Sequence, residues 1–160
     1  MGQRSIKDNK NYYFQSREKA NLTREVAADA LGISKSRLEK IEYDKSLPYP
    51  EEAKAMATCY KNPSLCNYYC SHDCAIGKDQ VPEIKEKALS QISLEMLSTL
   101  NELSNNKERF INIVADEVIS HDEIEDFNAI KENLHKMSLI VDSLNLWLEK
   151  TSIDNEHTYK

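Results

Sequence analysis

All four cysteines of this 160-residue chain lie between Cys59 and Cys74, close enough for their thiolates to act together. Cys66, Cys70 and Cys74 recur every four residues, so a continuous helix would place them along one face. If that helix breaks near His72, these three cysteines could bind Zn²⁺, with either His72 or Cys59 as the fourth ligand. An iron–sulfur cluster would use the thiolates alone. Zinc and an iron–sulfur cluster are therefore candidate cofactors.

The same cysteines also allow two interpretations without a metal. A reversible disulfide between two of them would make a redox-sensitive regulator. Alternatively, Cys66 and Cys70 pack at a junction beside Tyr68 and Tyr69, and Cys59 is a buried core thiol. The spacing C-x-x-x-C-x-x-x-C follows no standard zinc or ferredoxin pattern. The sequence therefore leaves metal binding, redox chemistry and packing open.

A second group of polar residues, around Gly32, could contact a polyanion. Thr23 and Ser34 are suited to begin helices, because their hydroxyls can accept hydrogen bonds from the first turn. Gly32 lies between the two helices, where a tight turn requires positive φ. In the second helix Leu38 and Ile41 face inward, which leaves basic and hydroxyl groups outside. This arrangement predicts a helix-turn-helix, whose second helix enters the DNA major groove.

The stretch LTREVAADALGISKSRLEKIEYDKSLP resembles the Cro/repressor-type (XRE-type) helix-turn-helix family. The family pattern is roughly L-T-x-x-x-x-A-x-x-L-G-[IV]-S-x-x-x-[IL]-x-x-[IW]-E-x-G-K-x-x-P, and the resemblance covers residues 12–62. One departure is Tyr43-Asp44, which replaces the usual Asn-Gly turn. The resemblance implies a five-helix, lambda-repressor-like DNA-binding domain with a recognition helix from Ser34 to Glu42.

The same resemblance assigns roles to individual side chains. The expected DNA-binding residues are Thr23, Arg24, Ser34, Lys35, Ser36, Arg37 and Lys40. Lys35, Ser36 and Lys40 would reach base edges, and Arg37 would lie near a base or the backbone. Thr23 and Arg24 would lie against phosphates, which agrees with the preference of phosphate for cations and helix N-termini. Arg17 and Glu42 would form a structural ion pair.

The C-terminal half is expected to form an acidic helical arm. Residues 1–62 carry 12 Lys+Arg and 9 Asp+Glu, a net charge of +3, whereas residues 63–160 carry 9 and 18, a net charge of −9. Pro82 can open a first helix, whose apolar stripe comprises Ile84, Leu89, Ile92, Met96, Leu100 and Leu103. Asn105-Asn106 ends this helix, and a shorter one follows. Ser120 to Glu123 then has the S-x-x-E form of a capping box for a third helix, which runs to about Lys150.

The third helix of the arm carries a heptad pattern. Its a and d positions are Phe127, Ile130, Leu134, Met137, Val141, Leu144 and Leu148, and Ile140 and Trp147 widen the apolar stripe. We expect a hairpin or three-helix arrangement within the chain that also forms a homodimer, since a dimer matches two DNA half-sites. The alternative is a self-contained bundle.

The composition of the chain and the motifs that it lacks limit the fold classes and functions that it could have. Three glycines and four prolines favour an all-α fold. No P-loop, nucleophile elbow or H-E-x-x-H motif is present, so we expect no enzyme. No apolar run approaches the about 20 residues that span a membrane. The N-terminus is polar, without a secretory signal, and a cytoplasmic location is expected.

Together these features predict a sequence-specific transcriptional regulator that binds double-stranded DNA. We expect a repressor that forms a homodimer through its C-terminal helices. The alternative is an antitoxin-like or protein-interaction module that uses the helix-turn-helix as a scaffold. The predicted organisation is a DNA-binding domain at 1–62, a Cys-rich junction at 63–81, an acidic arm at 82–150 and a polar tail at 151–160.

Overall fold

The computed structural model describes residues 10–115 and 118–155, and these residues form helices without any strand. The all-α prediction is confirmed. The chain divides into two compact units, Met1–Glu83 with Glu149–Lys160, and Ile84–Leu148.

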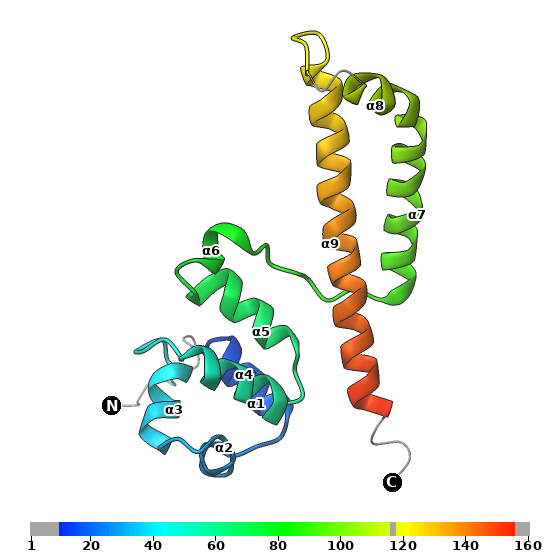
Figure 1. The fold of residues 1–160 in the computed structure, drawn as a ribbon. Coiled ribbons are helices and arrows are strands. Elements are labelled where there is room, and N and C mark those ends of the chain that lie inside the picture. Colours follow the sequence, from blue (N-terminus) through cyan, green and yellow to red (C-terminus); the bar gives the residue numbers. More distant parts are fainter. Residues whose placement is uncertain (1–9, 116–117, 156–160) are drawn as a thin grey trace, which may run out of the picture. The chain divides into compact units, whose positions relative to one another are not determined.

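The first unit is a cluster of short helices (Figure 1). Its elements are α1 (Tyr12–Lys19), α2 (Arg24–Leu31), α3 (Lys35–Glu42), α4 (Pro50–Cys59), α5 (Ser64–Tyr68), a π-helix η1 (Tyr69–Asp73) and α6 (Gly77–Gln80). The core residues are Tyr13, Ala27, Ala28, Leu38, Ile41, Met56, Ala57, Tyr60 and Leu65. Small residues on α2 and α4 let these helices approach closely around Leu38 and Met56, both fully buried. The predicted five-helix arrangement thus comprises α1–α5, although α5 lies beyond residue 62, in the segment predicted as a Cys-rich junction.

The turn after α3 shows how the departure from the family pattern is accommodated. Asp44 stands where the pattern has glycine, and it adopts a left-handed conformation with φ of +55°. Asp tolerates this region better than most residues. Its carboxylate accepts a hydrogen bond of 2.8 Å from the side chain of Asn11. Asn11 also caps α1, because its Oδ1 accepts from the Phe14 N–H at 3.1 Å. One short network therefore fixes both the start of α1 and the end of α3.

The cysteine-containing segment folds onto this unit as α5, η1 and α6. The Tyr68 ring lies 4.8 Å from that of Tyr12 and 5.5 Å from that of Tyr13, between ring centroids. The Tyr13 hydroxyl donates to Asp73 at 2.6 Å. Gly77 begins α6 against the backbone of Cys70, where an added Cβ would lie 2.1 Å from the carbonyl oxygen. Glycine is therefore required at this position for the chain to turn back.

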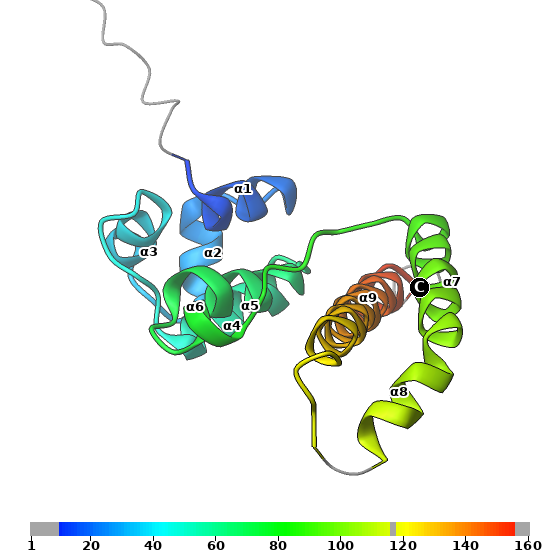
Figure 2. The same cartoon turned by 90° about the horizontal axis from the view of Figure 1, so that it is seen from above.

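In its described residues the second unit comprises α7 (Leu89–Asn105), α8 (Lys107–Val114) and most of α9 (Ile124–Asn155), whose residues from Glu149 onward belong to the first unit. The long helices α7 and α9 lie side by side in both views, which confirms the predicted pairing (Figures 1 and 2). The predicted helix start at Pro82 is wrong, since residues 81–88 are not helical. These residues carry four charges and little apolar surface, so a helix here would have no face to bury.

The capping box before α9 is present in part. The Glu123 carboxylate accepts from the backbone N–H of Ser120 at 3.1 Å and from its hydroxyl at 2.5 Å. This bond closes the turn that precedes the first residue of α9, Ile124. The sequence motif thus lies just before the longest helix, which begins a few residues later than a capping box at Ser120 predicts.

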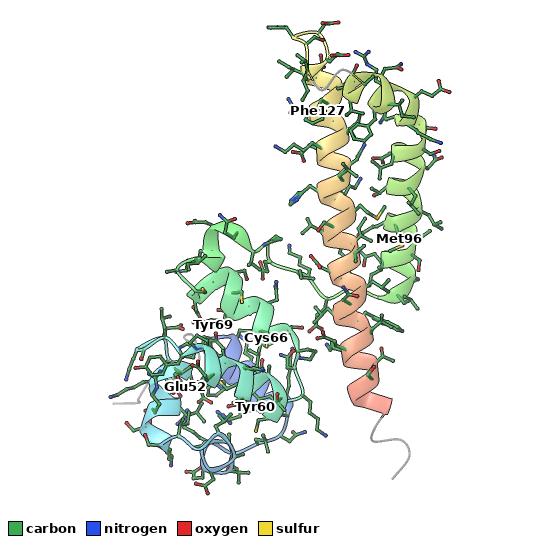
Figure 3. The ribbon with its side chains drawn as sticks, in the orientation of Figure 1. Glu52, Tyr60, Cys66, Tyr69, Met96 and Phe127 are labelled. Carbon is green, nitrogen blue, oxygen red and sulfur yellow. The ribbon has the colours of Figure 1, made fainter. Side chains whose placement is uncertain are left out.

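The predicted heptad stripe of α9 divides into a buried and an exposed part. Ile130 and Ile140 are buried, and the partly buried residues are Phe127, Met137, Leu144 and Trp147. In contrast, Leu134, Val141 and Leu148 are 49%, 41% and 49% exposed. The buried face is therefore rotated toward Ile140 from the a/d seam predicted from sequence. Figure 3 marks Phe127 on α9 and Met96 on α7, two residues of this unit's apolar interior.

Candidate nucleic-acid interface

The turn between α2 and α3 is built from three residues. Thr23 caps α2 by accepting from the Val26 N–H at 3.3 Å, and Ser34 caps α3 by accepting from the Arg37 N–H at 3.1 Å. Gly32 ends α2 with φ of +66°. A Cβ on Gly32 would meet no atom within 4 Å, so backbone conformation rather than space requires glycine. The result is two short helices joined by a tight turn, the geometry of a helix-turn-helix.

The two sides of α3 differ sharply. Leu38 and Ile41 are buried in the core, whereas Lys35, Ser36 and Lys40 are exposed on the opposite side. Ser34 and Thr23, the two cap residues, are also exposed. A cationic and hydroxyl-bearing helix face of this kind can contact both phosphates and base edges.

Glu42 anchors α3 from inside the domain. It is fully buried and accepts from Arg17 Nε at 2.5 Å and Arg17 Nη2 at 3.2 Å, which is the expected ion pair. Arg17 also donates to the Leu22 carbonyl at 2.7 Å. Arg24 Nε donates to the same carboxylate at 2.8 Å. Arg24, expected at a phosphate, is therefore also held by Glu42, and its role at DNA stays a prediction.

Arg37 forms a second clamp, between α3, α4 and the intervening loop. Its Nε and Nη2 donate to the two carboxylate oxygens of Glu52 at 2.9 and 2.6 Å. Nη1 donates to the Ser46 hydroxyl at 2.5 Å, and Nη2 also reaches the Leu47 carbonyl at 2.9 Å. Bonding to Glu52 raises the pKa of Arg37. A guanidinium held by four bonds primarily orders the loop, so a DNA contact by Arg37 stays a prediction.

Lys35 forms an ion pair with Glu25, which joins the first turns of α3 and α2. Both side chains are more than half exposed. For Lys40 no ion pair or side-chain hydrogen bond occurs within residues 10–115 and 118–155. Among the predicted base-contacting residues, the side chains of Lys40 and Ser36 thus form no hydrogen bond or ion pair with the described part of the chain.

Sequence reasoning missed the acidic partners Glu25 and Glu52. Glu52, labelled in Figure 3, lies 15 residues from Arg37 in the first turn of α4, where its carboxylate accepts from the Tyr49 N–H at 2.7 Å. A Glu in the first turn of a helix that begins with Pro50 is an available capping signal. Nothing local in the sequence indicates that Glu25 would meet Lys35, because the pairing depends on the angle between α2 and α3.

The cysteines are not gathered into a metal site in the described residues. All four are free thiols; Cys66 is exposed and the others are partly buried. Among residues 10–115 and 118–155, no three His, Cys, Asp or Glu side chains form a group that could hold a metal ion. His72 instead stacks on Tyr68, with ring centroids 4.3 Å apart. The structure gives the zinc and iron–sulfur interpretations no support, and metal binding stays a prediction.

Two thiols have environments that disfavour the thiolate. Burial raises the pKa of Cys59 and of Cys66 above the ordinary value for a thiol. Cys59 packs against the core of the first unit, in keeping with its predicted structural role. Because the thiolate is the form that reacts, a raised pKa lowers reactivity near neutral pH. The contacts at Cys59 therefore favour packing over redox chemistry, whereas Cys66 is exposed, so its predicted packing is not seen.

No helix in the described part of the chain is both long and apolar enough to cross a bilayer.

Among known families, the helix-turn-helix model HTH_3 matches residues 15–63. That range begins within α1 and ends just before α5, and it includes both caps, Gly32 and the whole of α3. Comparison with curated proteins and with solved structures gives no significant match. Residues 15–63 are therefore a helix-turn-helix domain of the Cro/C1 type (XRE), which implies DNA binding and is typical of non-enzymatic regulators of transcription.

Proposed function

We propose that the chain is a sequence-specific repressor that occupies double-stranded DNA as a homodimer. The observation that carries this proposal is the outer face of α3, where exposed Lys35, Ser36 and Lys40 oppose the buried Leu38 and Ile41. Helix-turn-helix domains present such a face to the major groove. Repression is the simplest output, because occupation of an operator blocks polymerase without any further contact.

A dimer is supported by the exposed line on α9. Leu134, Val141 and Leu148 are spaced seven residues apart, so they lie in one row along the helix. Such a row is self-complementary across a two-fold axis, the symmetry of most homodimers. Two DNA-binding domains related by this axis could read two half-sites about 34 Å apart.

The proposal is tested by titrating the full chain with duplexes selected from a random pool, with fluorescence anisotropy as the readout. Lys35→Ala with Lys40→Ala should weaken specific binding about 30-fold or more, since the variant loses two base contacts of about 1–3 kcal/mol each. The matched control is Lys19→Ala with Lys54→Ala, which removes the same charge from the exposed surfaces of α1 and α4. The control should change specific binding only slightly.

Unchanged duplex binding by the Lys35/Lys40 variant would refute the assignment of α3 as the recognition helix. Failure of the wild-type chain to bind any duplex would favour the alternative, an antitoxin-like or protein-interaction module. Transcription in vitro from a template with the selected site should fall in the presence of the wild-type chain. An increase would replace repression by activation.

A further inference from the structure

The helices proposed to meet DNA carry no net charge. Helices α2 and α3 together contain four basic residues and four acidic ones: Arg24, Lys35, Arg37 and Lys40 against Glu25, Asp29, Glu39 and Glu42. Affinity for DNA of arbitrary sequence comes mainly from cations that neutralise phosphates. Two helices whose charges cancel therefore contribute little to non-specific DNA binding.

The cancellation is local, because three of the four cations hold a carboxylate. Lys35 pairs with Glu25, and Arg37 is bound by Glu52. Arg24 bonds to Glu42 and also lies 3.9 Å from Glu39, between Nη1 and Oε2. Bonding to Lys35 lowers the pKa of Glu25, so this carboxylate remains charged at neutral pH. Each of these cations must keep or exchange its partner when DNA arrives.

The four carboxylates involved fall into two classes by exposure. The side chains of Glu42 and Glu52 are 0% and 13% exposed and act within the domain. Those of Glu25 and Glu39 are 61% and 47% exposed. Glu39 lies four residues after Lys35 and three after Ser36, so it shares their side of α3. Glu25 reaches the same side through its bond to Lys35.

A carboxylate on such a face has two opposite effects on binding. Close to a phosphate, the carboxylate is repelled by the like charge. Opposite a base atom that accepts hydrogen bonds, the carboxylate cannot form a hydrogen bond, because its own oxygens are also acceptors. Against the exocyclic amino group of cytosine, however, it accepts a hydrogen bond. An exposed glutamate on a recognition helix therefore penalises most sequences and favours few.

We propose that Glu25 and Glu39 are specificity-determining residues of this DNA-binding surface. Glu25 acts as a positioning residue: it restrains Lys35, which exchanges this partner for DNA only at a matching site. Glu39 reads cytosine directly at the base pair that it faces. The inference rests on the proposed function, since it requires that the outer face of α3 binds DNA.

The test compares Glu→Gln variants of the full chain on two duplexes, one selected by the wild type and one of mixed sequence. Glu25→Gln should raise affinity for the mixed duplex about 3- to 5-fold, a modest gain because the ion pair that it removes is exposed. It should also steepen the salt dependence by about one phosphate contact. Both changes should vanish in a Lys35→Met background, since the residue acts through Lys35.

The matched control is Glu18→Gln, which breaks the ion pair between Glu18 on α1 and Lys10, just before this helix, at 3.4 Å. It should leave both affinities and the salt slope unchanged. Glu39→Gln and Glu39→Ala are tested by repeating the selection from a random pool. The selected sites should lose a cytosine preference at one position in each half-site and keep the others.

The outcomes separate the inference from the proposed function. If Glu25→Gln behaves like Glu18→Gln, or its effect persists without Lys35, the role of Glu25 is refuted while DNA binding stands. If both Glu39 variants select the wild-type sequence, direct reading by Glu39 is refuted. If the wild-type chain binds no duplex at low salt, the proposed function and this inference fail together.

Discussion

The two units treat their apolar residues in opposite ways. Of the described residues, the first unit exposes four large apolar side chains, and the second exposes twelve, although it is the smaller of the two. The first closes its core with aromatic and small residues around Leu38 and Met56. The second pairs two long helices and still leaves rows of Leu, Ile and Val in solvent. Exposed apolar area of this extent usually indicates an interface.

The polar groups differ in the same sense. In the first unit Glu42 and Glu52 are withdrawn from solvent and bind arginines from other helices. In the second unit the ion pairs are more exposed, such as Arg109 with Asp126 at 2.6 Å. Exposed pairs contribute little to stability, whereas loss of one partner from a buried pair is costly. The first unit is therefore expected to be stable alone, and the second to gain stability from a partner.

The largest effect is expected when the buried carboxylate of Glu42, which links α1, α2 and α3, is removed. This change tests the difference between the buried and the exposed ion pairs. Glu42→Gln should lower the free energy of unfolding of the first unit by about 3–5 kcal/mol, because Arg17 would stay buried without its counter-charge. Urea denaturation followed by circular dichroism measures the change. Glu18→Gln, at an exposed pair, should change stability by less than about 0.5 kcal/mol. Equal effects would contradict the buried-pair account.

The next largest effect concerns the second unit. Leu134→Glu with Leu148→Glu should convert the proposed dimer to a monomer, with affinity reduced about 1,000-fold or more, since each of the two interface anchors contributes about 2 kcal/mol or more. Light scattering across a concentration series measures the association. The control is Leu94→Glu with Leu97→Glu, a pair on α7 that is even more exposed. A wild-type monomer, or a dimer that survives the α9 changes, would remove the exposed row as the interface.

Local signals in the sequence predicted the first unit well. Thr23, Ser34 and Gly32 act within a few residues of their own positions, so their roles follow from backbone chemistry. The Arg17–Glu42 pair followed from the family resemblance, since it spans 25 residues. The clamp of Arg37 by Glu52 was not predicted, because it depends on how α4 packs against α3. Long-range polar pairs are set by the tertiary structure rather than by local spacing.

The second unit shows the limit of periodicity. The heptad pattern identified α9 and its apolar residues, but it could not tell which neighbouring stripe would meet α7. Ile140 lies on the buried stripe and Val141, one position later, on the exposed one. A rotation of this size depends on the shape of the facing helix, where Ile92 and Thr99 are buried. The helix start was misplaced for a related reason, because Pro82 permits a helix and only packing selects it.

The smallest expected effect concerns the cysteine-containing segment, α5, η1 and α6. It tests whether this segment unfolds together with the rest of the first unit. Burial and the bond to Asp73 raise the pKa of Tyr13. The unfolded chain releases this proton near pH 10 and the folded chain does not. Stability from Tyr13 is therefore complete below about pH 10 and is lost as the pH rises above it.

Tyr13→Phe should cost about 1 kcal/mol at pH 7, for one hydrogen bond, and should lessen the loss of stability in alkali. Urea midpoints at pH 7 and pH 10.5 measure both effects. Asp73→Asn is the companion variant, since it removes the charge and retains a hydrogen-bond acceptor. At pH 7, Asp73→Asn should lose less stability than Tyr13→Phe. It should also reduce the loss of stability at pH 10.5. If neither variant changes the unfolding of the first unit, α5, η1 and α6 do not unfold together with the helix-turn-helix.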